Sequence, residues 1–188
     1  MSSPATPSQT AGPFVSIGTT WLAGANLADV PGPAAVEVTG TVTDGAGAPV
    51  TDAMLEFWQA DSEGHFPPET ADGWTGFARL FTDTEGRYRL VTVKPGPPRA
   101  SLGAQVAAEA PHIEVSIFAR GLLQRLVTRV YFPGEPANVA DPALSALSPD
   151  LQERLVAQAG ATGASGRQVY HFDVHLQGER ETVFFAPW

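Results

Sequence analysis

The sequence contains no cysteine, which excludes both a disulfide framework and a thiolate metal site. Basic residues are also scarce, because 11 lysines and arginines stand against 20 acidic residues and give a formal net charge of −9. This balance argues against nucleic-acid binding, which needs a basic surface to neutralise phosphates. No apolar run approaches the ~20 residues of a membrane-spanning helix. The N-terminus lacks the charged and apolar regions of a secretory signal peptide, so we expect a cytoplasmic protein.

Turn-forming residues are abundant, with 19 glycines and 17 prolines among 188 residues. Hydrophobic residues make up 43% of the chain, which is typical of a globular protein. The length fits one ordinary domain. Residues 1–13 are rich in Ser, Thr and Pro and predict an N-terminal arm, so we place the domain at residues 14–188.

Short segments of alternating apolar and polar residues predict β-strands, and turn residues separate them. The expected strands are 36–42, 54–59, 77–81, 88–93, 112–118, 125–132, 169–176 and 182–185. Asp83 to Gly86 predict a hairpin turn between the third and fourth strands, and 125–132 is expected to pair with 112–118. One short helix is expected after Ser148, with Pro149 in its first turn. The predicted fold class is therefore all-β, an antiparallel β-sandwich with one short helix and long loops.

His112 and Glu114 are the most informative polar pair, since they alternate with apolar residues and point to one face about 7 Å apart. A hydrogen-bonded strand pair explains them most simply, and a metal site with one further ligand is the alternative. His171 and His175 share a face with Asp173, but about 13 Å of strand separates the two histidines, too far for one ion. We expect that face to meet solvent.

Several segments, taken in order over residues 6–185, resemble the intradiol ring-cleavage dioxygenases. They are Thr6-Pro-Ser-Gln-Thr-Ala-Gly-Pro-Phe14, Leu55-Glu-Phe-Trp-Gln-Ala-Asp61, Thr92-Val-Lys-Pro-Gly96, Pro111-His112-Ile113, Phe118-Ala-Arg-Gly121, Thr128-Arg-Val-Tyr-Phe132 and Gly178-Glu-Arg-Glu-Thr-Val-Phe-Phe185. Enzymes of this family are similar to one another in a ferric site of two tyrosines and two histidines. The resemblance thus implies a β-sandwich fold and O₂-dependent ring cleavage.

The ligand pattern of the family is degenerate in this sequence. Pro98 stands where the resemblance places one tyrosine, and residues 65–77 contain no tyrosine for the other. Glu114 replaces the second histidine, and Glu109 replaces an arginine three residues before the first. Only His112 remains of the four ligands, so the resemblance implies a chain that binds no metal and has no catalytic residue of its own.

The two-chain members of the family imply a homologous iron-binding β subunit as the partner of such a chain, and a higher hetero-oligomer built from the pairs. The partner would hold Fe(III) and cleave protocatechuate with O₂ to 3-carboxy-cis,cis-muconate, while the isolated chain would be inactive. The resemblance implies that the N-terminal arm lines the partner's active site, with Thr10, Gly12 and Pro13 as substrate contacts. Arg129 is the candidate contact for the substrate carboxylate, which a guanidinium fork fits well.

A transthyretin-like or carboxypeptidase-regulatory-like binding module is the alternative function. Gly40-Thr-Val-Thr-Asp44 and Thr82-Asp-Thr-Glu-Gly86 are common in such β-domains. The arm and the hairpin from Phe118 to Phe132 are features that those modules lack, and they favour the dioxygenase subunit.

Overall fold

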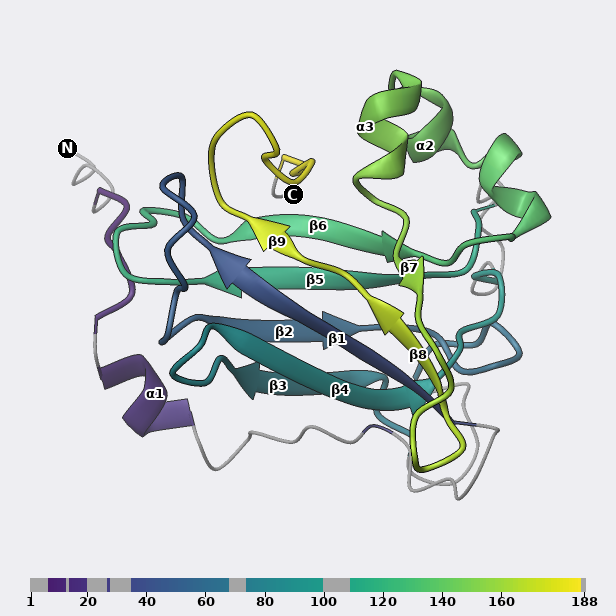
Figure 1. Ribbon diagram of the computed structural model, residues 1–188, viewed down its shortest axis with the longest axis horizontal. Helices are drawn as coiled ribbons and strands as arrows, with labels where there is room; N and C mark the ends of the chain where they lie inside the picture. The colour runs from purple at the N-terminus through teal and green to yellow at the C-terminus, as the bar shows by residue number, and fades with distance from the viewer. Residues whose placement is uncertain are drawn as a thin grey trace, which may run out of the picture.

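Two β-sheets packed face to face make up most of the computed structural model, which describes residues 7–12, 14–19, 27, 35–67, 74–99 and 109–186 (Figure 1). The strands are β1 Ala35–Thr43, β2 Met54–Trp58, β3 Phe77–Phe81, β4 Arg87–Val93, β5 His112–Phe118, β6 Leu126–Tyr131, β7 Gln158–Ala159, β8 Gln168–His171 and β9 Val174–His175. The helical segments are α1 Phe14–Thr19, a 3₁₀ helix Pro136–Ala140, α2 Pro142–Ser145 and α3 Pro149–Glu153. No helix in these ranges is long and apolar enough to cross a membrane.

The predicted all-β sandwich is confirmed, with one departure from a purely antiparallel arrangement. One sheet has the order β3-β2-β5-β6 and is antiparallel throughout. The other has the order β4-β1-β8-β7, with β9 also pairing with β1, and both β8 and β9 run parallel to β1. The chain enters these strands only after the helical region, which lets it return in the same direction as β1. The predicted pairing of β5 with β6 is confirmed.

The predicted hairpin between β3 and β4 is wrong, although its turn is present. β3 pairs with β2, and β4 pairs with β1 in the opposite sheet. The Asp83 carboxylate accepts hydrogen bonds from the backbone N–H groups of Glu85 and Arg87, at 2.8 and 2.9 Å, and so forms the tight turn. This turn carries the chain from one sheet to the other. Alternation cannot distinguish the two outcomes, because each strand buries one face against the same core.

Three further expected elements are present in the structure in a different form or in different company. The strand expected at 169–176 is two short strands, separated where the Asp173 carboxylate accepts from the backbone and hydroxyl of Thr41, both at 2.8 Å. The strand expected at 182–185 is only a bridge between Phe185 and Val127. The helix after Ser148 is confirmed as α3, but it is one of several short helical segments.

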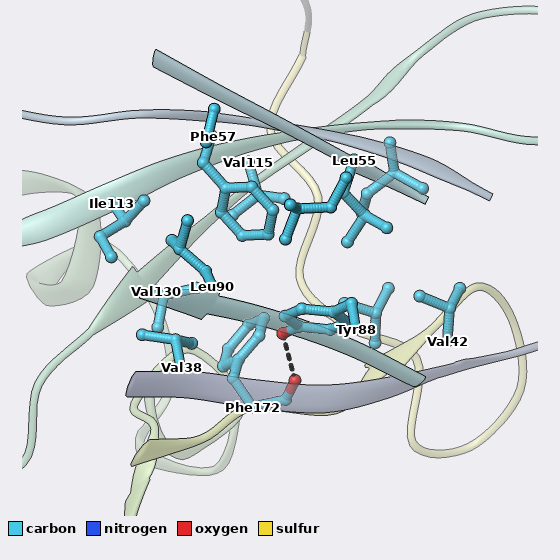
Figure 2. Close-up of a cluster of buried hydrophobic side chains, with 14 of the residues drawn as sticks. Val38, Val42, Leu55, Phe57, Tyr88, Leu90, Ile113, Val115, Val130 and Phe172 are labelled. Carbon is cyan, nitrogen blue, oxygen red and sulfur yellow. Dashed lines mark hydrogen bonds between the residues drawn. The ribbon is translucent and has the colours of Figure 1, made fainter. Parts of the chain in front are cut away.

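The core lies between the sheets and contains the inward-facing residue of each alternating pair (Figure 2). Its fully buried members include Val38, Val42, Leu55, Phe57, Leu90, Ile113 and Val130. Gly40 on β1 has no Cβ, and a Cβ there would collide with the carbonyl of Phe172. That close approach lets the buried Tyr88 hydroxyl donate to the Phe172 carbonyl at 2.5 Å, as Figure 2 shows.

A second, smaller core lies between β6 and the helical segments, formed by Ala110, Tyr131, Leu144 and Leu155. The backbone N–H of Tyr131 donates to the Leu155 carbonyl at 2.8 Å, and Ala157 N–H donates to the Tyr131 carbonyl at 2.9 Å. These bonds fix the helical region against the strand end that carries His112 and Tyr131, which is where the candidate site lies.

Candidate functional site

Polar side chains gather on the outer face of β5 and β6, at the N-terminal end of β5. The register places Glu114 opposite Arg129 and His112 opposite Tyr131. Glu109, just before β5, completes the group. We call Glu109, His112, Glu114, Arg129 and Tyr131 the β5–β6 cluster.

Arg129 is the centre of the β5–β6 cluster. Its Nη1 atom lies 3.0 Å from Glu109 Oε2, and its Nη2 atom lies 3.1 Å from Glu114 Oε1. The Arg129 side chain is only 14% exposed, and its guanidinium carbon lies 5.7 Å from the centre of the Phe185 ring. Two carboxylates of the same chain therefore hold this cation, and each pair is a charge-assisted hydrogen bond.

His112 is buried against Tyr131, and its Nδ1 atom has a hydrogen-bond partner. Nδ1 lies 2.8 Å from the Ala110 carbonyl, which can only accept, so Nδ1 carries the proton. Nε2 lies 3.6 Å from Glu109 Oε2. Burial lowers the pKa of His112 below its ordinary value, and the nearby Arg129 charge lowers it further.

Asp141 accepts hydrogen bonds from Ala110 and from Tyr131 of the β5–β6 cluster. The sequence did not predict a role for it. It is fully buried, and its Oδ2 accepts from the Ala110 N–H at 2.8 Å. Its Oδ1 accepts from the N–H groups of Ala143 and Leu144 and from the Tyr131 hydroxyl, at 2.9, 3.0 and 3.1 Å. Burial raises the pKa of Tyr131 far above its ordinary value, so its hydroxyl stays a donor. Asp before Pro142 is an N-cap signal that could have identified α2 from the sequence.

The described part of the N-terminal arm lies beside the turn between β5 and β6, away from His112 (Figure 1). The Thr10 hydroxyl accepts from the Gly121 N–H at 2.8 Å and lies 3.5 Å from the Ala119 carbonyl. A Cβ added at Gly12 would have open space around it. Pro13 lies outside the described residues. β5 separates this turn from His112 by six residues of strand, or roughly 20 Å, so residues 7–12 of the arm do not reach the β5–β6 cluster.

The remaining candidates lie elsewhere. Pro98 is half-buried in the loop after β4, where Arg99 N–H donates to the Gly64 carbonyl at 2.9 Å. His171 and His175 point away from the core and contact the hydroxyls of Thr39 and Thr43, at 3.0 and 2.8 Å. The predicted outward face of this segment is therefore confirmed, with Phe172 and Val174 buried on its other side.

Comparison with known proteins identifies the class of this sandwich. A family model described as "Dioxygenase" matches residues 22–178. A solved structure of a dioxygenase domain from Streptomyces sp. SirexAA-E has a TM-score of 0.62 and 27% identity, covering 83% of this chain and 88% of its own. The chain belongs to the intradiol ring-cleavage dioxygenase family.

Within this family the chain is similar to a particular subunit type. It is 47% identical to the protocatechuate 3,4-dioxygenase alpha chain of Burkholderia cepacia, over 80% of this chain and 76% of the relative. It is 40% identical to the corresponding alpha chain of Pseudomonas putida, over 97% and 96%. The beta chain of the Burkholderia cepacia enzyme is 34% identical, over 78% and 66%. These relatives favour the dioxygenase subunit over the binding-module alternative.

The family implies a non-haem iron in its catalytic subunit, and the β5–β6 cluster does not fit that ion. The Arg129 guanidinium already lies between Glu109 and Glu114, so a second cation would meet its charge. His112 contributes a single imidazole, which is buried and faces Glu109. Among the described residues, no group of three or more His, Cys, Asp or Glu side chains could hold a metal ion.

We expect acidification to destabilise this protein partly through His112. Because burial and Arg129 hold its pKa below the ordinary value, the unfolded chain takes up the proton first as the pH falls. The stabilisation is therefore complete above the unfolded pKa of about 6.5 and is lost as the pH falls through the folded pKa. Denaturant unfolding from about pH 7 to about pH 4.5 should show a steeper loss in the wild type than in His112→Gln. Parallel curves would show that His112 titrates alike in both states.

Proposed function

We propose that this chain is the alpha, non-iron-binding subunit of a protocatechuate 3,4-dioxygenase. A homologous beta subunit would hold the Fe(III), bind protocatechuate and O₂, and release 3-carboxy-cis,cis-muconate. The single observation that carries the proposal is the β5–β6 cluster, where a guanidinium held by two carboxylates lies beside the one remaining imidazole. Similarity over nearly the whole length to an alpha chain supports it, and the similarity to a beta chain supports a partner of the same fold. Cytoplasmic residence stays a prediction.

The N-terminal arm would serve the partner's active site, with Thr10, Gly12 and Pro13 as contacts. Its position supports this role, because Thr10 is attached at the β5–β6 turn, roughly 20 Å of strand from this chain's own His112. Thr10 and Gly12 therefore lie too far from this chain's own β5–β6 cluster to contact it, which favours contact with another chain. Gly12 offers backbone without a side chain, which suits close approach to a planar ring.

Arg129 would meet the substrate carboxylate only by exchanging one of its present partners. Glu109 and Glu114 occupy the two ends of its guanidinium. Rearrangement at the interface with the beta subunit would have to release one of them. An Arg129→Ala variant therefore tests directly whether Arg129 contacts the substrate carboxylate.

Co-purification of the tagged chain from its native cells tests the proposed subunit. We expect a second chain that is similar in sequence and carries tyrosine and histidine ligands, with iron in proportion to that chain and protocatechuate cleavage by the complex. The tagged chain expressed alone should contain no iron and cleave nothing. Iron that follows this chain in the absence of a partner, or a complex without ring-cleaving activity, would overturn the proposal. Native mass determination of the same sample gives the number of pairs in the higher oligomer.

A further inference from the structure

A large pocket lies on the sheet opposite the β5–β6 cluster, and the proposed function does not use it. Its volume is about 700 Å³, which is within the range of about 300–1,000 Å³ that is usual for sites of small organic ligands. Three neighbouring strands of that sheet, β4, β1 and β8, contribute residues to it, and so does β3 of the other sheet. A ligand there would leave the β5–β6 cluster free.

Hydrogen-bonding side chains form a row across these three strands. The register places Arg89 of β4 opposite Thr39 of β1, and Thr39 beside His171 of β8. Thr39 Oγ1 lies 3.0 Å from His171 Nδ1. Arg87 is two residues from Arg89 on β4, so both side chains point to the same face, about 7 Å apart. The pocket therefore combines two guanidinium groups, a hydroxyl and an imidazole.

The two arginines of this row keep donors that the chain itself does not use. Glu37 accepts from Nη2 of Arg89, and no described residue accepts from its Nε or Nη1 groups. The side chains of Arg87 and Arg89 are 57% and 52% exposed. Ion pairs at such exposure are weak and screened by salt, so an incoming anion with more charge can compete with them.

The carboxylates that line the pocket already accept hydrogen bonds from this chain. Asp173 Oδ1 accepts from the backbone N–H and the hydroxyl of Thr41, both at 2.8 Å. Asp83 Oδ1 accepts two backbone N–H groups of its own turn, and its Oδ2 lies 2.9 Å from Arg87 Nε. Three arginines line the pocket against these two carboxylates. Within a chain of net charge −9, the pocket is therefore a place where an anion meets donors.

The rest of the pocket is apolar and preformed. Leu80 and Phe81 of β3 and the ring of Tyr88 line it. Leu80 and Tyr88 are buried in the core, and the Tyr88 hydroxyl is fixed by its hydrogen bond to the Phe172 carbonyl. Phe81 is only half-buried, so part of its ring remains open. A fixed wall of this kind accepts an apolar body at little cost in side-chain entropy.

We propose that this pocket binds an organic phosphate of mononucleotide size. The apolar body would lie against Leu80 and Phe81, and the phosphate would lie between Arg87 and Arg89. A phosphate monoester carries nearly two negative charges near pH 7 and three acceptor oxygens, so it can bridge both guanidinium groups at once. The assignment does not rest on the proposed subunit function, because every residue that it uses belongs to this chain.

Calorimetric titration of the full-length chain with AMP at low ionic strength tests the site. We expect a Kd on the order of 1 mM, as suits a small ligand in a partly open pocket, and about tenfold weaker binding by Arg89→Gln. Adenosine, which has no phosphate, and inorganic phosphate, which has no apolar body, should each bind about tenfold more weakly than AMP. Arg99→Gln is the matched control, because Arg99 is exposed and outside the pocket and the substitution removes the same charge, so the affinity should stay unchanged.

Three results would each overturn the assignment. The first is AMP binding that is absent, or unchanged in Arg89→Gln, while circular dichroism shows both chains folded. The second is an equal loss in Arg89→Gln and Arg99→Gln, which would indicate a general attraction of the anion to basic residues. The third is inorganic phosphate that binds as tightly as AMP, because the apolar wall would then play no part. None of these results depends on co-purification of a beta subunit, so the two proposals can fail separately.

Discussion

Asp141→Ala is expected to destabilise this protein more than any other single substitution considered. The substitution leaves the N–H groups of Ala110, Ala143 and Leu144 and the Tyr131 hydroxyl without their acceptor, and Asp141 has no exposed surface through which water could replace it. Unsatisfied buried donors cost about 1–3 kcal/mol each, and a lost helix cap costs about 0.5–2. Allowing for relaxation, we expect a loss of about 3–5 kcal/mol. For a domain of this size that is a fall in Tm of roughly 6–20 °C, measurable by calorimetry.

Asp44→Ala is the matched control for this experiment. Asp44 also accepts two backbone N–H groups, those of Ala46 and Ala48, both at 2.9 Å. It lies in an exposed turn, so water can take the place of the lost carboxylate, and the fall in Tm should be much smaller. Equal effects of the two substitutions would show that burial of Asp141 does not set its contribution. They would also remove our explanation of how the helical region is fixed to β6.

Local strand patterns predicted most of the fold, whereas long-range pairing was beyond them. The alternation at β1, β2 and β5 follows from burial of one face, and it identified these strands within one or two residues. The partner of each strand depends on contacts distant in sequence. Asp83 therefore predicted a turn correctly, while the hairpin that it suggested was wrong. The parallel pairing of β8 with β1 depends in the same way on where the helical region returns the chain.

The candidate site shows the same division. His112 and Glu114 were predicted to share a face because a strand has a period of two residues. That Arg129 lies between Glu109 and Glu114 depends on the register of β5 and β6 and on the path of the chain before β5. The resemblance supplied the role proposed for Arg129 and marked Glu109 and Glu114 as replaced positions, but it did not predict that these two carboxylates would hold Arg129. The sequence did not predict a role for Asp141, because two of its partners, Ala110 and Tyr131, are distant in sequence.

Arg129→Ala is expected to cause the second-largest loss of stability, and the loss should depend on pH. Near pH 7 the variant leaves the carboxylates of Glu109 and Glu114 close together without their shared cation, and both side chains are about three-quarters buried. Breaking a fully buried pair costs about 3–5 kcal/mol, so for these partly exposed groups we expect about 2–3 kcal/mol. Arg89→Ala is the control, because Arg89 is half exposed in its pair with Glu37, and such pairs contribute about 1 kcal/mol at most.

The same variant separates a structural role of Arg129 from contact with substrate. Without the Arg129 charge, one influence that lowers the pKa of His112 disappears, and protonated His112 could then face Glu109 as a replacement cation. Denaturant unfolding should therefore show a smaller difference from the wild type near pH 5 than near pH 7; an equal difference would contradict a charge role. If Arg129 also meets the substrate carboxylate, the assembled enzyme should lose about 1–3 kcal/mol of binding for protocatechuate and little for catechol, which has no carboxylate. Equal losses for both rings would leave Arg129 as the internal counter-ion of Glu109 and Glu114, because a disturbed fold affects both substrates alike.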